Sequence, residues 1–280
     1  MAEYLLDLHI HTSESSLCGR VSAREMVRAY REAGFHGVAI TDHYAFFFVE
    51  RFKDMPWADV VDLYMRGYEE AKAEAAGTDF RVYFGLEYRD RVTVDDYLIY
   101  GVDRQFLLDN PDLHDVTVRE AAERVHKYGG VILQAHPGRM TYGMAMGSEL
   151  FTGFGQKNMN AHMRSGDVIP EISWYDRNSL IGGPAQLMKL QMCTLREGDV
   201  LDGIEIYNGN HSWAQDQTMV EQYRREHPEY VCIAASDFHG PPCGYGGTYF
   251  DCLPEDDKAL VRALKEKRIT GWKSSYGVEL

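Results

Sequence analysis

Short apolar segments alternate with helical segments along most of this chain, and this alternation restricts the fold more than any other feature. The apolar runs have the length of buried strands and are spaced like the strands of βα units. Alternating strands and helices predict a parallel sheet covered by helices, and this number of strands favours a closed barrel over an open sheet. The runs are Tyr4–His9, His36–Thr41, Phe80–Leu86, Tyr97–Gly101, Val131–His136, Gly203–Tyr207 and Tyr230–Ser236.

Helix signals lie between several of these predicted strands. Ser22 with Glu25 has the pattern of a capping box, and Thr117 with Glu120 repeats it. Two further helices are expected at about residues 58–76 and 255–267, the first ending at a glycine and the second with its apolar residues on one face. The prediction is therefore an α/β fold with a barrel-like sheet.

The segment at about residues 140–197 breaks the alternation. It is rich in methionine, glycine and asparagine, has no clear period and is too long for an ordinary connection. We interpret it as an insertion after the strand that ends at His136, which in a barrel places it on the active-site face as a lid or a small subdomain. No repeat or linker marks a boundary, so residues 1–280 are predicted to form one domain.

Composition restricts the partners and the compartment. The formal net charge of -14 disfavours nucleic acid or an anionic membrane as a partner, whereas a small anionic substrate is compatible because bound metal ions would reverse the local sign. Five cysteines without a C-x-x-C pair favour a reducing cytoplasm over a disulfide framework. The start MAEYLLDLHIH lacks a basic segment, and no stretch approaches the roughly 20 apolar residues of a membrane span. We expect a cytoplasmic protein, and the sequence predicts no oligomeric state.

Metal-ligand residue types recur where the predicted strands end. Side chains two residues apart on a strand point the same way, so His9 with His11 can chelate one ion, as can Asp237 with His239. Barrel enzymes build their sites from the ends of several strands, and mixed imidazole and carboxylate ligands suit zinc, manganese or iron. A single histidine of this kind is more often structural, but several at one end predict a metal site. The set is His9, His11, Asp42, His43, Glu87, His136, Asp237 and His239.

Other residues are candidates for contact with substrate or for catalysis. Arg139 comes shortly after His136 and could reach a phosphate with its planar fork, although a surface arginine fits the pattern nearly as well. Asp42 could orient a ligand imidazole or serve as general acid, or it only caps the following turn. His211 follows a predicted strand on the active-site face and is a weaker candidate for binding substrate. The remaining histidines are interpreted as structural or surface residues.

Five sequence segments occur in a recognisable order, and together they resemble the PHP family, named for polymerase and histidinol phosphatase. The segments are DLHIHT (Asp7–Thr12), TDH (Thr41–His43), GLE (Gly85–Glu87), AHPGR (Ala135–Arg139) and SDFHG (Ser236–Gly240). They span nearly the whole chain except the predicted insertion. The resemblance implies a distorted TIM-like (β/α)7 barrel and, in stand-alone members, a phosphoesterase site with two or three metal ions.

The resemblance also implies a distribution of ligands. One ion would be bound by His9, His11, Glu87 and Asp237, a second by His43 and His239, and a third by Glu87 and His136. Members with three ions usually carry another histidine shortly after the H-x-H pair, where Cys18 stands near, and one in the strand after the glutamate, where Tyr97 stands near. The implied cofactors are two or three divalent ions of zinc, manganese or iron, and these departures favour two.

The sequence therefore predicts a metal-dependent hydrolase that cleaves a small phosphate monoester, of the histidinol phosphate, nucleotide or sugar phosphate class. Asp42 and Asp237 are the predicted catalytic residues, and Arg139 and His211 are predicted to bind the substrate. Two alternatives stay open. One is an amidohydrolase-type enzyme that cleaves C–N bonds, whose binuclear members commonly use a lysine where this chain has Glu87. The other is a barrel in which the metal ions only stabilise the fold.

Overall fold

All the predicted strands are present in the computed structural model, which describes residues 3–89, 95–144, 188–192, 195, 197–210 and 215–275. The short strands β3, β11 and β12 were not predicted. The predicted ones are β1 (Tyr4–Ile10), β2 (Gly37–Ile40), β4 (Arg81–Arg89), β5 (Tyr97–Tyr100), β6 (Val131–Gln134), β9 (Gly203–Asn208) and β10 (Val231–Ala235), and the additional ones are β3 (His43–Ala45), β11 (Gly247–Phe250) and β12 (Ile269–Lys273).

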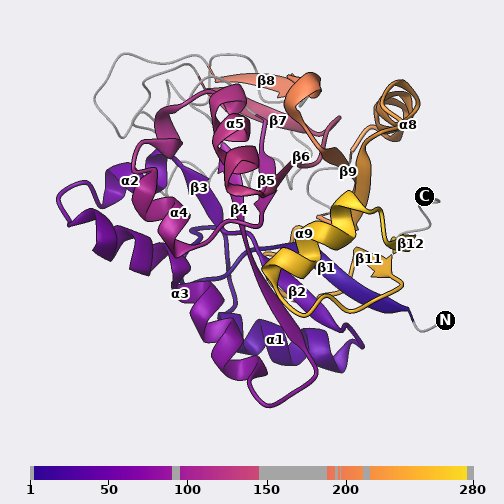
Figure 1. Cartoon of the computed structure of the whole chain (residues 1–280), viewed down its shortest axis with the longest axis horizontal. Coiled ribbons are helices and arrows are strands. Elements are labelled where there is room, and N and C mark those ends of the chain that lie inside the picture. The colour runs from indigo at the N-terminus through magenta and orange to yellow at the C-terminus, as the bar shows by residue number, and fades with distance from the viewer. Residues whose placement is uncertain are drawn as a thin grey trace.

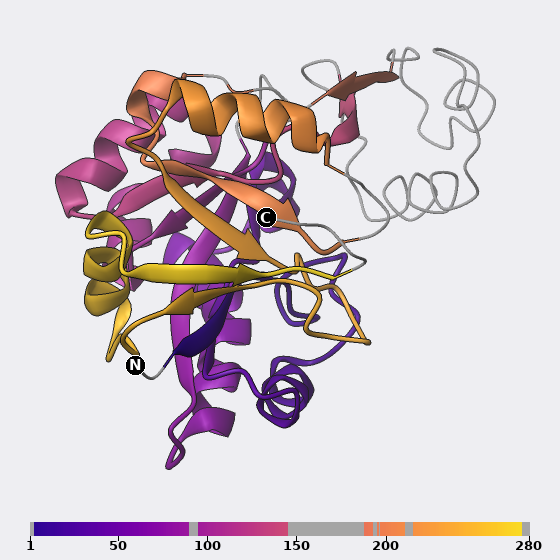
Figure 2. The same cartoon turned by 90° about the vertical axis from the view of Figure 1, so that its right-hand side faces the viewer.

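These strands form one sheet in the order β10-β9-β6-β5-β4-β2-β1-β11-β12, with β3 beside β4. The sheet curls until β10 meets β1 and β11 (Figure 2). Ile10 and Phe238 form an isolated parallel bridge there, and the Thr248 hydroxyl on β11 bonds to both the N–H and the carbonyl of Ala234 on β10. The result is a nearly closed barrel, which confirms the predicted fold class.

The sheet is not parallel throughout, and in this respect the prediction was wrong. β5 runs antiparallel to both of its neighbours, β4 and β6, and β11 and β12 are also antiparallel to the strands beside them. The connection from Arg89 to Tyr97 explains β5, because it is shorter than the dozen or so residues that a parallel crossover needs. β5 therefore starts at the end of the barrel where the parallel strands finish.

The predicted helices are also present. Ser22 and Thr117 each cap a helix with the predicted capping box, in which the side chain of the third helical residue, Glu25 or Glu120, reaches back to the cap. No helix among the described residues is long and apolar enough to cross a membrane. The predicted helices are α1 (Ala23–Glu32), α3 (Trp57–Ala75), α5 (Val118–Tyr128) and α9 (Asp257–Lys265), and three that were not predicted are α2 (Phe46–Arg51), α4 (Arg104–Asp109) and α8 (Gln217–Glu226).

Two groups of buried apolar side chains hold the barrel together. One lies between the sheet and the helices that cover it, with α1 and α3 side by side along one flank (Figure 1). The other fills the barrel interior and includes residues of α9, which packs against β4 and β5. We call the part of the interior farthest from the carboxyl ends of the parallel strands the apolar end, represented by Leu6, Tyr83, Phe250, Leu260 and Leu264.

The predicted insertion begins and ends in a separate two-stranded sheet. β7 (Met140–Met144) pairs antiparallel with β8 (Met188–Met192), and this small sheet starts directly after Arg139 (Figure 1). Residues 145–187 lie outside the described residues. The insertion at 140–197 and the single domain over residues 1–280 therefore stay predictions.

Candidate metal centre

The first two candidate ligands come from the end of β1. The pairing of β1 with β2 shifts register between Asp7 and Ile10. Beyond this shift His9 and His11 are both fully buried, and their Nε2 atoms lie 3.2 Å apart. The predicted convergence of the two imidazoles is therefore present in the structure.

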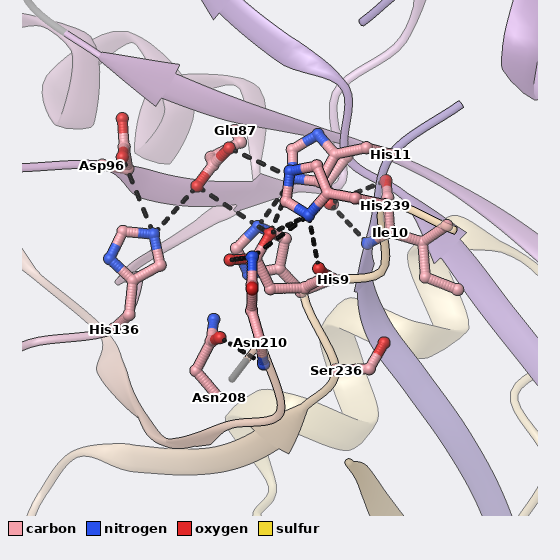
Figure 3. A network of polar contacts seen from close by, with 12 residues as sticks. His9, Ile10, His11, Glu87, Asp96, His136, Asn208, Asn210, Ser236 and His239 are labelled. Atoms are coloured by element: carbon pink, nitrogen blue, oxygen red, sulfur yellow. Dashed lines mark hydrogen bonds and ion pairs between the residues drawn. The ribbon is translucent and has the colours of Figure 1, made fainter. Parts of the chain in front are cut away.

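Glu87, near the end of β4, lies at the middle of the cluster. Its Oε1 is 3.2 Å from Nε2 of His9 and 3.1 Å from Nε2 of His136, while its Oε2 is 2.5 Å from Nδ1 of His43. Figure 3 shows the carboxylate between His136 on one side and the β1 histidines on the other. Glu87 is therefore placed to bridge two ligand groups.

The last strand end contributes Asp237 and His239. Asp237 has a left-handed backbone, with φ of 52°, and its Oδ1 lies 3.1 Å from Nε2 of His11 and 3.5 Å from Nε2 of His9. His239 stacks on His11 with ring centroids 4.4 Å apart. The ligand atoms of His9, His11 and Asp237 all lie within 4.8 Å of one another, which is the spacing of a shared ion. Together with Glu87, these residues form what we call the ligand end of the barrel.

The donor atoms fit a divalent cation. Oε2 of Glu87 is buried and lies near ring nitrogens of His43 and His11, yet it makes no hydrogen bond of good geometry among the described residues. Nitrogens and carboxylate oxygens that converge without hydrogen-bond geometry are typical of ligands around an ion. Imidazole with carboxylate is the donor set of zinc, manganese and iron rather than of calcium.

The electrostatics of the ligand end agree with this fit. Burial alone would raise the pKa of Glu87, but the imidazoles of His43 and His9 hold it well below the usual value. Burial alone would lower the pKa of His9, but the carboxylates of Asp237 and Glu87 hold it well above the usual value. Burial lowers the pKa of His239 to about 3. A cation bound at this cluster would take the place of the proton on His9, so its binding would release that proton.

Asp96 belongs to this site although the sequence did not predict it. It is fully buried, and its Oδ2 lies 3.6 Å from Nε2 of His136, so that His136 stands between Asp96 and Glu87 (Figure 3). Arg89 forms a two-pronged ion pair with the same carboxylate. The ligand atoms of His43, Glu87 and Asp96 form another group within 4.8 Å.

Of the two residues that the resemblance offered as replacements for missing histidines, only one lies at the site. Tyr97 is opposite Tyr88 in the β4–β5 ladder, whereas Glu87 is opposite Leu98. Neighbouring residues of a strand point to opposite faces, so Tyr97 faces the covering layer and not the barrel interior. Cys18, by contrast, has its sulfur within 4.8 Å of ligand nitrogens of His11, His43 and His239.

Glu205 on β9 orients the ligands from behind. Its Oε1 lies 3.0 Å from Nδ1 of His9, and its Oε2 accepts a hydrogen bond of 2.7 Å from the backbone N–H of His136. A carboxylate on the far nitrogen of a ligand histidine sets the ring's orientation and increases its basicity. The sequence signal was a glutamate inside the apolar run GIEIYN, which a search of strand ends passes over.

The structure describes one of the two residues predicted to bind the substrate, Arg139, and also places Asn210 beside Asp237. Arg139 is nearly buried, and its Nη1 donates a 2.8 Å hydrogen bond to Oδ2 of Asp237. Asn210 also donates to Oδ2 of Asp237, at 3.3 Å, and was not predicted. His211 lies outside the described residues.

Asp42 is buried beside the ligand end, and both of its carboxylate oxygens accept hydrogen bonds from Thr12. Its Oδ1 accepts from the Thr12 backbone N–H and its Oδ2 from the Thr12 hydroxyl, both at 2.7 Å. Gly67 of α3 permits this approach, because a Cβ there would lie 2.1 Å from Oγ1 of Thr12. Burial raises the pKa of Asp42. These contacts support an orienting role more than an acid role, and the catalytic role of Asp42 stays a prediction.

Comparison with known proteins agrees with this geometry. Residues 7–141 match the family model of the PHP domain, and no curated protein matches the sequence. A two-domain protein from Bacteroides vulgatus, containing a predicted PHP-like metal-dependent phosphoesterase, is similar over 96% of this chain and 64% of its own, with 16% identity and a TM-score of 0.56. This chain thus spans less than two thirds of that protein, and the likeness shows a shared fold. An amidohydrolase from Chromobacterium violaceum, solved with bound sulfate and no metal, is similar over 95% of this chain and 97% of its own, with 15% identity and a TM-score of 0.46.

Proposed function

Because residues 7–141 match the family model of the PHP domain, we propose that this chain is a metal-dependent phosphoesterase that hydrolyses a small phosphate monoester. The observation that carries the proposal is the convergence of Glu87 with the β1 histidines and Asp237 in one buried cluster. The Bacteroides vulgatus protein, whose fold is shared, contains a domain predicted to have the same kind of activity.

Each side chain has a role that follows from its contacts. His9, His11, Glu87 and Asp237 would hold one ion, and His43 and His239 would hold a second. When bound, divalent ions supply positive charge to the phosphoryl oxygens and lower the pKa of a water molecule. The Asp237 carboxylate and the His239 imidazole stay in the forms that bind a metal ion near neutral pH. The pKa of Asp237 is well below its usual value, and that of His239 is about 3.

The substrate's phosphate is proposed to lie beside Arg139. The guanidinium is held at Asp237 by the hydrogen bond between Nη1 and Oδ2, so its charge stays next to the ligands. An arginine at this position favours a phosphate dianion over a neutral ester or amide. Asp42 and His211 complete the proposed set as orienting and substrate-binding residues. Screening of phosphate monoesters is the way to identify whether the phosphate is carried by histidinol, a nucleoside or a sugar.

The test is phosphate release from a panel of phosphate monoesters by protein loaded in turn with zinc, manganese or iron. We expect metal-dependent release that falls by more than ~100-fold in Asp237→Asn, since loss of an outer partner of a ligand alone costs 10–100-fold. Asp251→Asn is the matched control, because Asp251 pairs with Arg268 on the surface. Release at full rate in Asp237→Asn would contradict the proposal, and turnover of amides or lactones instead would favour the C–N hydrolase.

A further inference from the structure

The loop between β1 and α1 brings a thiol to the ligand end. Cys18 lies in this loop, and its sulfur shares a 4.8 Å neighbourhood with ligand nitrogens of His11, His43 and His239. The cysteine also forms a side-chain hydrogen bond with His43. A sulfur among three imidazoles is a donor set, since each of these four side chains offers an atom that binds zinc.

Backbone contacts that do not involve the thiol hold the loop in place. Arg20 N–H donates to the carbonyl of His239 at 2.8 Å, and Ser13 N–H donates to the carbonyl of Val21 at 3.0 Å. Gly19 allows the tight path, because a Cβ there would lie 2.3 Å from the carbonyl oxygen of Thr12. The position of Cys18 is therefore imposed by its neighbours, so replacing its side chain leaves the loop path intact.

Among the described cysteines, Cys18 differs from the others by its surroundings. Cys232, Cys243 and Cys252 are also free and partly buried, but none of them belongs to a group of metal-ligand side chains in the described part of the chain. Of the four cysteines that the structure describes, Cys18 is thus the one that combines a thiol with imidazoles at ligand spacing.

We propose that Cys18 is a thiolate ligand of the ion held by His43 and His239, and that it makes this half of the centre select zinc, cobalt or ferrous ion over manganese and magnesium. The proposal rests on the metal centre of the proposed function. The thiol releases its proton when the ion binds, as metal-bound cysteines do. Soft thiolate favours zinc-like ions, whereas the carboxylate-rich half around Glu87 and Asp237 accepts manganese as well.

The test uses the full chain loaded with cobalt, whose bond to a thiolate gives a sulfur-to-metal charge-transfer band in the near ultraviolet. We expect this band in the unaltered protein and in Cys252→Ser, and its loss in Cys18→Ser. Zinc affinity at one of the two positions should fall by ~10–100-fold or more in Cys18→Ser, with manganese affinity unchanged. Cys18→His should retain the full cobalt content, measured by mass spectrometry, but lack the band.

Two outcomes would overturn the inference. One is persistence of the charge-transfer band in Cys18→Ser; the other is cobalt-loaded protein that shows the visible d–d bands of bound cobalt but no thiolate band. In both cases metal-dependent phosphate release would survive, so the proposed function would stand. Failure of the unaltered protein to bind cobalt, zinc or manganese would overturn the proposed function itself. Circular dichroism of Cys18→Ser and Cys18→His controls for folding.

Discussion

The two ends of the barrel are lined by the same strands but have opposite chemistry. Along β4 the inward side chains run from Tyr83 at the apolar end to Glu87 at the ligand end, and along β10 they run from Ile233 toward Asp237. A shift of a few residues on one strand thus replaces buried apolar surface by a buried charge. The difference shows that this sheet keeps packing and ligand chemistry in separate layers.

The two layers also differ in what they contribute to folding. Buried apolar side chains at the apolar end lower the free energy of the folded state, whereas buried carboxylates and imidazoles raise it unless they are paired. His136 and Asp237 add backbone strain, since both have positive φ, 33° and 52°, which costs about 1–3 kcal/mol at each residue. We expect the apolar end to stabilise the folded protein and the ligand end to destabilise it when no metal ion is bound.

The largest expected effect is on stability, from a cavity at the apolar end. Leu264 of α9 is fully buried, so Leu264→Ala should lower the free energy of unfolding by about 2–5 kcal/mol, measured by urea denaturation. Zinc affinity should not change, because Leu264 belongs to the apolar group of the interior and its side chain offers no ligand atom. A parallel loss of zinc affinity would mean that the two layers are coupled after all.

Removal of metal should have the next largest effect. An ion present at a hundred times its Kd stabilises the folded protein by ~2.7 kcal/mol, so chelation should lower the Tm measured by calorimetry. Leu264→Ala should retain this response to chelator, whereas Asp237→Asn should largely lose it. If chelator did not change the Tm of the unaltered protein, the ligand end would not need a cation for its stability.

A change behind the ligands should act on affinity and leave the barrel intact. Glu205→Gln keeps the side-chain shape but removes the charge 3.0 Å from Nδ1 of His9. We expect zinc affinity to fall by ~10–100-fold. Titration against a coloured chelator measures it. Unchanged affinity, with folding verified by circular dichroism, would show that His9 needs no charged partner.

The smallest effect is expected outside both layers. Arg28 and Glu74 form an ion pair on the surface between α1 and α3, with the Arg28 side chain 59% exposed. Arg28→Ala should change neither the unfolding midpoint nor the zinc affinity measurably, since exposed ion pairs contribute little. A clear change in either would mean that this surface ion pair contributes to stability or to metal binding, which the comparison of the two ends does not include.

The strand ends that bring the parallel part of the candidate site together could be located from the sequence because periodicity and strand ends are local properties. His9, His11 and Glu87 follow directly from apolar runs, and each lies in the cluster. Asp96 was missed because β5 is antiparallel, so that its first residues and not its last lie at the ligand end. A search at strand starts as well as strand ends would have found it.

Other members of the site depend on properties that a linear pattern does not contain. Glu205 lies within a strand. Its role beside His9 can be recognised only when it is known which face of the strand points into the barrel. The place of Cys18 depends on the path of a loop held by Gly19 and by backbone contacts to His239. The positions of Glu205 and Cys18 relative to the ligands are set only when the barrel closes in three dimensions.

The meeting of β1 with β10 has a consequence for synthesis of the protein. His9 and His11 leave the ribosome well before Asp237 and His239, and the Ile10–Phe238 bridge later joins the two segments. A growing chain therefore exposes the β1 histidines without the carboxylate of Asp237, and the full group of His9, His11 and Asp237 first exists once the last parallel strand docks. Metal uptake at this group therefore requires that the chain has been made and folded at least through His239.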